Sequence, residues 1–213
     1  MPRPSQISAP PAGPENPDHL EAAPAAVAGT PGFLRLLAHS RAAFKAYVGM
    51  GEALGQGKLT RCQRERIALA VAEINGSVYG LSAHYAGARE AGLGEDEIRL
   101  ARQSRSHDPQ AAAMLRFVQS MTLQRGEISD ADFASLAQAG FAPDEILEII
   151  SNIALNIFAD YCNNAVRTEV DFPLLRPGVE KPGAGGQTAL AARCPRFDGG
   201  IIKTEKQLNH HES

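Results

Sequence analysis

The sequence predicts an all-α protein, a compact helical bundle of about seven to eight helices. Apolar residues recur at helical spacing from about residue 32 to about residue 176. Pro109 and Pro143 each begin such a stretch, where proline suits the first helical turn because its missing N–H would have no partner there. No alternating apolar and polar run bounded by turns is long enough to predict a strand.

The predicted helices follow one another along this stretch. Thr60 followed by Gln63 has the pattern of a capping box and starts the third helix. Ser77 starts the fourth, and Gly92 is placed to close it in a left-handed conformation. The remaining predicted helices are Phe33–His39, Ala42–Leu54, Glu95–Gln103, Pro109–Gln124, Ser129–Ala139 and Pro143–Val170.

The last predicted helix, Pro143–Val170, carries apolar residues around most of its circumference. A helix that is apolar on several sides is usually buried. In a domain of this size the helix therefore either lies at the centre or packs against another subunit. We expect a homo-oligomer.

Residues 1–31 and 177–213 differ in composition from the helical part. Eight of the 14 prolines fall in residues 1–31, which predicts a Pro-rich N-terminal arm with little regular structure. Residues 177–213 are rich in glycine and proline and predict a C-terminal tail, either on the surface or across a neighbouring subunit. The folded domain is expected at 32–176.

The composition excludes several classes of protein. A net charge of −3 argues against a protein that coats nucleic acid or an anionic membrane, and no run approaches 18 apolar residues. Three widely spaced cysteines form no disulfide framework, and their odd number leaves at least one free thiol. No secretory signal opens the chain, so we expect a cytoplasmic protein.

The most informative segment is residues 59–93. Glu65 lies on one predicted helix and His84 on the next, with a break at Asn75-Gly76 between them. Glu65 lies twelve residues before position 77, and His84 lies four residues after position 80. This register, together with the later segment NIFADYCNNAVRTEVDFP, resembles the alkylhydroperoxidase D-like and carboxymuconolactone decarboxylase superfamily over about residues 32–176.

The resemblance implies a helical fold, assembly into dimers, trimers or hexamers, and a proton relay between the glutamate and the histidine. The redox members of the superfamily carry two cysteines at the positions of Ser77 and Gly80. A dithiol peroxidase needs one thiolate to attack the peroxide and a second thiol to resolve the sulfenic acid. Serine and glycine do neither, so this chain is identified as a member that lacks the redox Cys-x-x-Cys.

The acid–base half of the motif remains. Glu65 and His84 are the candidate catalytic pair for proton transfer next to a carbonyl. Ser77 is expected near a helix N-terminus, where it caps the helix or holds a carboxylate or an oxyanion. Gly80 is expected to open space for a substrate, and Tyr79 to offer it a hydrogen bond.

Other polar residues of the segment have simpler interpretations. Arg64 is a candidate for binding an anionic substrate, although it and Arg66 are also typical of a charged surface. We expect Glu73 to form a structural salt bridge. The tail histidines, His210 and His211, lack a third spaced ligand, so we predict no metal site and no cofactor.

Three functions follow. The first is a cofactor-free acid–base enzyme of the decarboxylase, lyase or isomerase type, acting through Glu65 and His84 on a small carboxylated or carbonyl compound. The second is a peroxidase-related role, of the alkylhydroperoxide reductase or peroxiredoxin type, through Cys62 or Cys162 and an external thiol. The third is a non-catalytic oligomeric binding protein. A small-molecule substrate is expected, and neither nucleic acid nor membrane is.

Overall fold

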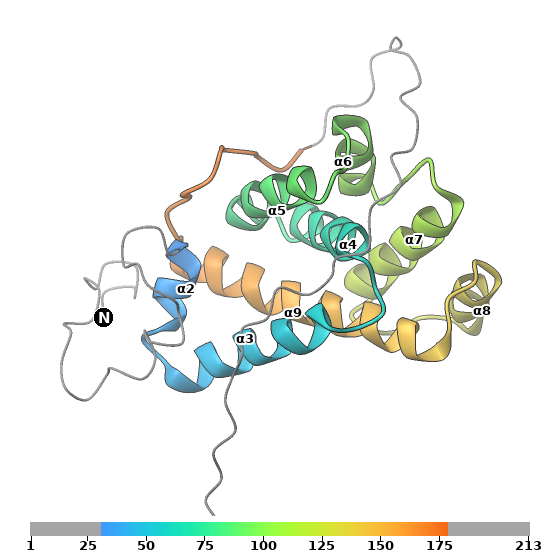
Figure 1. Cartoon of the computed structure of the whole chain (residues 1–213), viewed down its shortest axis with the longest axis horizontal. Coiled ribbons are helices and arrows are strands. Elements are labelled where there is room, and N and C mark those ends of the chain that lie inside the picture. Colours follow the sequence, from blue (N-terminus) through green and yellow to red (C-terminus); the bar gives the residue numbers. More distant parts are fainter. Residues whose placement is uncertain (1–30, 179–213) are drawn as a thin grey trace, which may run out of the picture.

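The computed structural model describes residues 31–178, which form eight α-helices and no strand (Figure 1). The all-α prediction is confirmed. In chain order the helices are α2 (Gly32–Leu37), α3 (Arg41–Gly55), α4 (Arg61–Ile74), α5 (Val78–Glu90), α6 (Glu95–Arg102), α7 (Pro109–Leu123), α8 (Asp130–Gln138) and α9 (Pro143–Val166).

Helix α4 lies at the centre of the bundle. It packs against α5, α6, α7 and α9, and its residues 67–72 are all buried. Ile67, Leu69 and Val71 have no exposed surface, since neighbouring helices cover this part of α4 on several sides. Because α5 is the helix that follows it and also packs against it, side chains of α4 and α5 meet across their interface.

The predicted helix ends are confirmed where local chemistry determines them. Thr60 and Gln63 form the capping box at the start of α4. At the end of α5, Gly92 has φ +91°, the Gly92 N–H donates to the Arg89 carbonyl, and the Leu93 N–H donates to the Ala88 carbonyl. These are the two hydrogen bonds of a Schellman motif. Pro109 and Pro143 occupy the first turns of α7 and α9.

Helix α9 ends at Val166, four residues before the predicted end. Arg167 takes a left-handed conformation with φ 59°, and the Thr168 N–H donates to the Asn163 carbonyl. The chain then turns back, and Val170 and Phe172 pack into a second apolar cluster around Phe33, Leu37, Phe44, Tyr79 and Ala159. We attribute the early end to this burial, since the turn carries Val170 and Phe172 into that cluster.

No helix within 31–178 is long and apolar enough to cross a membrane. The N-terminal arm at 1–31 and the tail at 177–213 lie almost wholly outside the described residues, so both stay predictions.

Candidate functional site

The side chains of Glu65 on α4 and His84 on α5 meet at the interface of these two helices. Glu65 Oε2 lies 2.9 Å from His84 Nδ1. The Glu65 side chain is 16% exposed and the His84 side chain 28% exposed. The pair is therefore sheltered enough for strong electrostatic interaction and open enough to reach a small molecule.

Gly87 explains how the carboxylate comes so close to α5. A Cβ atom at Gly87 would lie 2.8 Å from Oε1 and 2.9 Å from Oε2 of Glu65. Any larger residue would push the carboxylate away from His84. Arg61 lies one turn before Glu65 on α4, with its Nε 3.9 Å from Oε1, and also pairs with Glu90.

The surroundings of His84 favour its protonated form. Burial alone would lower the pKa of His84, but the hydrogen bond and the negative charge of Glu65 outweigh it. The charge of Asp160 and a hydrogen bond that the ring donates to the Asn156 side chain act in the same direction, and the pKa of His84 is raised above its usual value. The pair is thus a carboxylate–imidazolium pair over a wider pH range than an exposed histidine would allow.

Asp160 on α9 is the site residue that sequence reasoning missed. Its side chain is 2% exposed. Asn75 Nδ2 donates to Asp160 Oδ2 over 3.0 Å. Burial raises the pKa of Asp160, against the opposing effects of hydrogen bonds from Asn75 and Ser77 and of the charge of His84. The missed signal was a row of buried polar residues within the apolar α9: Asn152, Asn156, Asp160 and Asn163.

The same fold is found in known proteins. Residues 41–120 match the carboxymuconolactone decarboxylase family. A structure of an uncharacterized peroxidase-related protein from Silicibacter sp. TM1040 aligns with a TM-score of 0.67 at 25% identity, over 79% of this chain and 93% of that chain. A peroxidase-related protein with an alkylhydroperoxidase AhpD core, from Ralstonia eutropha JMP134, aligns with a TM-score of 0.60 at 26% identity, over 66% of this chain and 77% of that chain.

The family match and these structures support the resemblance of the chain to the alkylhydroperoxidase D-like and carboxymuconolactone decarboxylase superfamily. The debrominase Bmp8, solved in complex with 2,3,4-tribromopyrrole, shares its fold with a TM-score of 0.59 at 17% identity, over 66% of this chain and 77% of that chain. No functionally curated protein matches the chain.

Ser77 caps helix α5, as the preference of serine for helix N-termini predicts. Its Oγ accepts the Gly80 N–H over 3.0 Å and caps α5. Its hydroxyl also hydrogen-bonds the Asp160 carboxylate and thereby lowers the pKa of Asp160, so the hydroxyl acts as the donor. Ser77 has no exposed surface. Its donor and acceptor are both engaged, so the hydroxyl is not free to hold a substrate oxyanion here.

Gly80 does not open free space for a substrate, which differs from the expectation. A Cβ atom at Gly80 would overlap Oδ1 of Asp160 and lie 2.9 Å from Ser77 Oγ. The carboxylate of Asp160 therefore takes the place of a side chain at position 80. This contact could not be predicted from the sequence, because Asp160 is 80 residues further along the chain.

Tyr79 and Arg64 each form a hydrogen bond with the backbone near the start of a helix. The Tyr79 hydroxyl accepts the Phe33 N–H over 3.1 Å, and burial raises the pKa of Tyr79. Arg64 donates to the Leu59 carbonyl at the start of α4, and burial lowers its pKa. Both polar groups thus have protein partners. The substrate contacts predicted for Tyr79 and Arg64 stay predictions.

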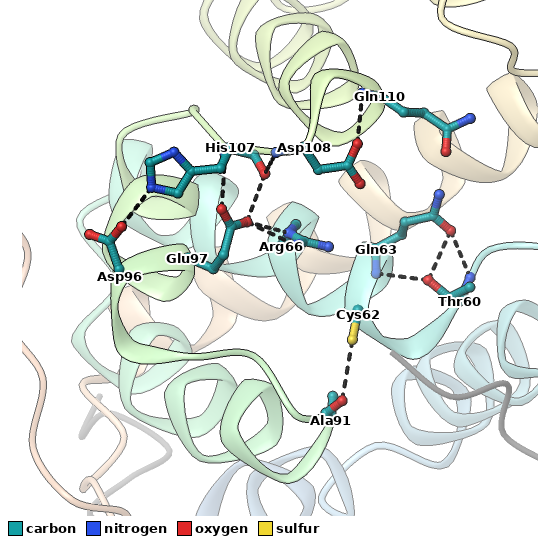
Figure 2. Close-up of polar contacts among 11 residues, drawn as sticks. Thr60, Cys62, Gln63, Arg66, Ala91, Asp96, Glu97, His107, Asp108 and Gln110 are labelled. Atoms are coloured by element: carbon teal, nitrogen blue, oxygen red, sulfur yellow. Dashed lines mark hydrogen bonds and ion pairs between the residues drawn. The ribbon is translucent and has the colours of Figure 1, made fainter. Parts of the chain in front are cut away.

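Two further charged residues of α4 form structural ion pairs. Glu73 pairs with Arg102 at 2.9 Å, as expected. Arg66 is 11% exposed and pairs with Glu97 of α6 at 2.8 Å. Figure 2 shows that Glu97 also accepts hydrogen bonds from the loop before α7, and the donors are Ser106 Oγ and the His107 N–H. These pairs join α4 to α6 and the following loop.

The cysteines do not form a peroxidase site among the described residues. Cys62 is disulfide-bonded and 1% exposed, and its Sγ lies 3.2 Å from the Ala91 carbonyl oxygen (Figure 2). Cys162 is free, and burial raises the pKa of its thiol, which makes it a poor nucleophile. Cys194 lies outside 31–178. Within that range no group of His, Cys, Asp and Glu is arranged to hold a metal ion.

A separate cavity of about 370 Å³ lies between α5, α6 and the segment after α9. Tyr85 faces this cavity, and its hydroxyl donates to Glu95. Tyr85 is therefore no partner of the Glu65–His84 pair. The other lining residues are Ile98, Arg99, Arg102, Pro173, Leu174 and Leu175.

Proposed function

We propose that the protein is a cofactor-free acid–base enzyme of the decarboxylase, lyase or isomerase type, acting on a small carboxylated or carbonyl compound. The observation that carries the proposal is the 2.9 Å contact between Glu65 and His84, both partly exposed. A glutamate and a histidine that share a hydrogen bond can exchange a proton with each other and with a bound substrate.

In the proposed reaction Glu65 and His84 divide the proton transfer. The Glu65 carboxylate takes the proton from a carbon next to a carbonyl, and the C–H electrons move onto the carbonyl oxygen as an enolate. The His84 imidazolium then returns a proton to carbon. In a decarboxylation the C–C bond to the carboxylate breaks, carbon dioxide leaves, and His84 protonates the resulting carbanion. Both versions balance without an external oxidant or reductant.

In this proposal the buried residues near the Glu65–His84 pair, Ser77, Asp160 and Tyr47, do not contact the substrate. The buried side chains of Ser77 and Asp160 occupy the space beside Gly80. Tyr47 of α3 stays protonated, because burial and the charges of Asp160 and Glu65 raise its pKa to about 12. A substrate then approaches from the exposed edge of Glu65 and His84.

The test is catalysed exchange of the α-proton for deuterium in D₂O, followed by NMR over a panel of ketones, β-keto acids and unsaturated lactones. We expect Glu65→Gln and His84→Gln each to lower the rate about 100-fold or more. Glu90→Gln is the matched control, because Glu90 lies on α5 with a side chain that is 69% exposed. Full activity of either site variant on a substrate that the protein turns over would refute the assignment.

Peroxidase-related chemistry is the second candidate, because two of the similar structures are described as peroxidase-related. It would have to proceed without thiols at positions 77 and 80. Consumption of hydroperoxide by the natural protein with a dithiol reductant would favour it over the first candidate. A protein that binds small carbonyl compounds without turning them over would instead be the non-catalytic binding protein.

A further inference from the structure

Asp160 is fixed in the site by a fit that only glycine at position 80 permits. Oδ1 of Asp160 lies so close to Gly80 that the Cβ of any other residue at position 80 would overlap it. The same position is bounded by Ser77 Oγ at 2.9 Å and by the Ala72 Cβ at 3.1 Å from that Cβ position. The carboxylate is therefore enclosed by α4 and α5, although Asp160 itself belongs to α9.

This carboxylate is buried without a Lys or Arg partner. Its hydrogen bonds come from neutral groups, Asn75 Nδ2 and the Ser77 hydroxyl, and no Lys or Arg of residues 31–178 forms an ion pair with it. A buried carboxylate is costly unless hydrogen bonds or an opposite charge offset its desolvation. The cation whose charge stabilises it is His84.

The charges around His84 come from two other helices. Glu65 approaches from α4, with Arg61 3.9 Å from its other oxygen. Asp160 approaches from α9, and Tyr47 on α3 is affected by both carboxylates. Asp160 Oδ1 lies against Gly80, which is one helical turn before His84 on α5, so the Asp160 carboxylate lies near the same face of α5 as the imidazole.

We propose that Asp160 is a positioning residue whose negative charge keeps His84 protonated and so holds the Glu65–His84 pair in its charged, proton-donating form. Glu65 supplies the direct hydrogen bond, and Asp160 supplies a second charge that water and salt do not reach, because it is 2% exposed. The use of this charged pair in catalysis rests on the proposed function. The electrostatic link between Asp160 and His84 does not.

The raised pKa of His84 supports the proposal, since the charge of Asp160 contributes to it after the hydrogen bond and charge of Glu65. The link is reciprocal, and the charge of His84 lowers the pKa of Asp160 against the effect of burial. Such mutual effects are expected when two ionisable groups share a poorly hydrated site.

The test is an NMR titration of the histidine ring signals of the full chain, with the His84 signal assigned by its loss in His84→Gln. In Asp160→Asn, which keeps size and removes charge, we expect the His84 midpoint to move to lower pH. Asp144→Asn is the matched control, because it makes the same change at an exposed carboxylate in the first turn of α9, where Asp144 pairs with Lys58. Its His84 midpoint should stay close to that of the natural protein.

A second variant covers the case in which Asp160→Asn fails to fold. In Gly80→Ala/Asp160→Ala the new methyl at position 80 occupies volume that the carboxylate has vacated, and the same shift of His84 is expected. An unchanged His84 midpoint in a folded form of either variant overturns the proposal. Failure of the proposed function would give a different result. Glu65→Gln would then keep its activity, while the His84 midpoint would still shift in Asp160→Asn.

Discussion

The carboxylate of Glu65 lies against the backbone of Gly87, where a Cβ would be 2.8 Å from Oε1 and 3.0 Å from Cδ. Gly87 is three residues after His84 on α5, so the missing side chain faces the same partner helix as the imidazole. The glycine gives Glu65 the room in which it reaches His84.

Gly87→Ala should therefore disconnect the pair without unfolding the protein. The Glu65 carboxylate is the end of a flexible side chain and can move aside, while alanine favours a helix over glycine by about 0.5–1 kcal/mol. We expect an unchanged or slightly higher melting temperature and a His84 ring titration at lower pH. Gly49→Ala is the control, because a Cβ at Gly49 in α3 meets nothing within 4 Å. A His84 midpoint that shifted equally in both variants would contradict this explanation.

The raised pKa of His84 predicts how stability depends on pH. A histidine whose folded pKa lies above its unfolded value stabilises the fold below the unfolded pKa, and this contribution is lost as pH rises through the folded pKa. Urea unfolding of the natural protein and of His84→Gln should therefore differ most near pH 6 and least near pH 9. The expected change in that difference is on the order of 1 kcal/mol, as for a charged hydrogen bond. A constant difference would show that Glu65 does not favour the protonated ring.

Local signals made the helices of this chain predictable, while the site required contacts between distant segments. Gly92 closes α5 and Ser77 caps it through bonds to residues within a few positions, so their spacing was sufficient. Glu65 and His84 were found because two consecutive helices carry them in a recognisable register. Their mutual contact follows from the packing of α4 on α5.

Asp160 and Tyr79 show where the sequence was insufficient. Asp160 lies in a helix whose sequence is mostly apolar, and only the packing of α9 against α4 and α5 brings Asp160 beside Gly80. Tyr79 is predicted to offer a substrate a hydrogen bond, because it is an aromatic residue with a polar tip in the motif segment. The helix directs its ring instead into the cluster with Phe33 and Phe172. Adjacent residues on a helix point in different directions, so the sequence alone did not show which way the Tyr79 ring points.

The overlap at Gly80 also predicts how peroxidase chemistry can be introduced. Ser77→Cys/Gly80→Cys alone should consume no hydroperoxide, because the side chain at position 80 would collide with Asp160. Adding Asp160→Ala provides the volume, and the triple variant should consume hydroperoxide with a dithiol reductant. Asp160→Ala alone is the control. Turnover by the double variant would mean that the Asp160 side chain moves aside easily.

The Arg66–Glu97 pair should contribute to stability rather than to the site. Glu97→Ala leaves Arg66 buried without its partner and removes the acceptor of Ser106 Oγ and the His107 N–H, at an expected cost of about 3 kcal/mol. Burial would raise the pKa of Glu97, but these hydrogen bonds and Arg66 outweigh it and lower the pKa. The stabilisation is therefore present at neutral pH and is lost as pH falls through the folded pKa. Urea unfolding at pH 7 and at pH 3 measures both effects, and an equal cost at the two values would contradict them.

The outer face of α9 predicts assembly of the chain with copies of itself. Leu147 is 65% exposed and Tyr161 63% exposed, and Phe158 lies on the same face at 38%. Such a large apolar stripe on one helix is typical of a surface that packs against a partner. Light scattering after size exclusion should give a mass of at least two chains, and Leu147→Glu/Tyr161→Glu should weaken assembly about 100-fold or more, because two buried charges face each other across a symmetric contact. Leu174→Glu, at a site 57% exposed outside α9, should leave the mass unchanged. A natural protein that elutes as a single chain would show that the stripe serves another purpose.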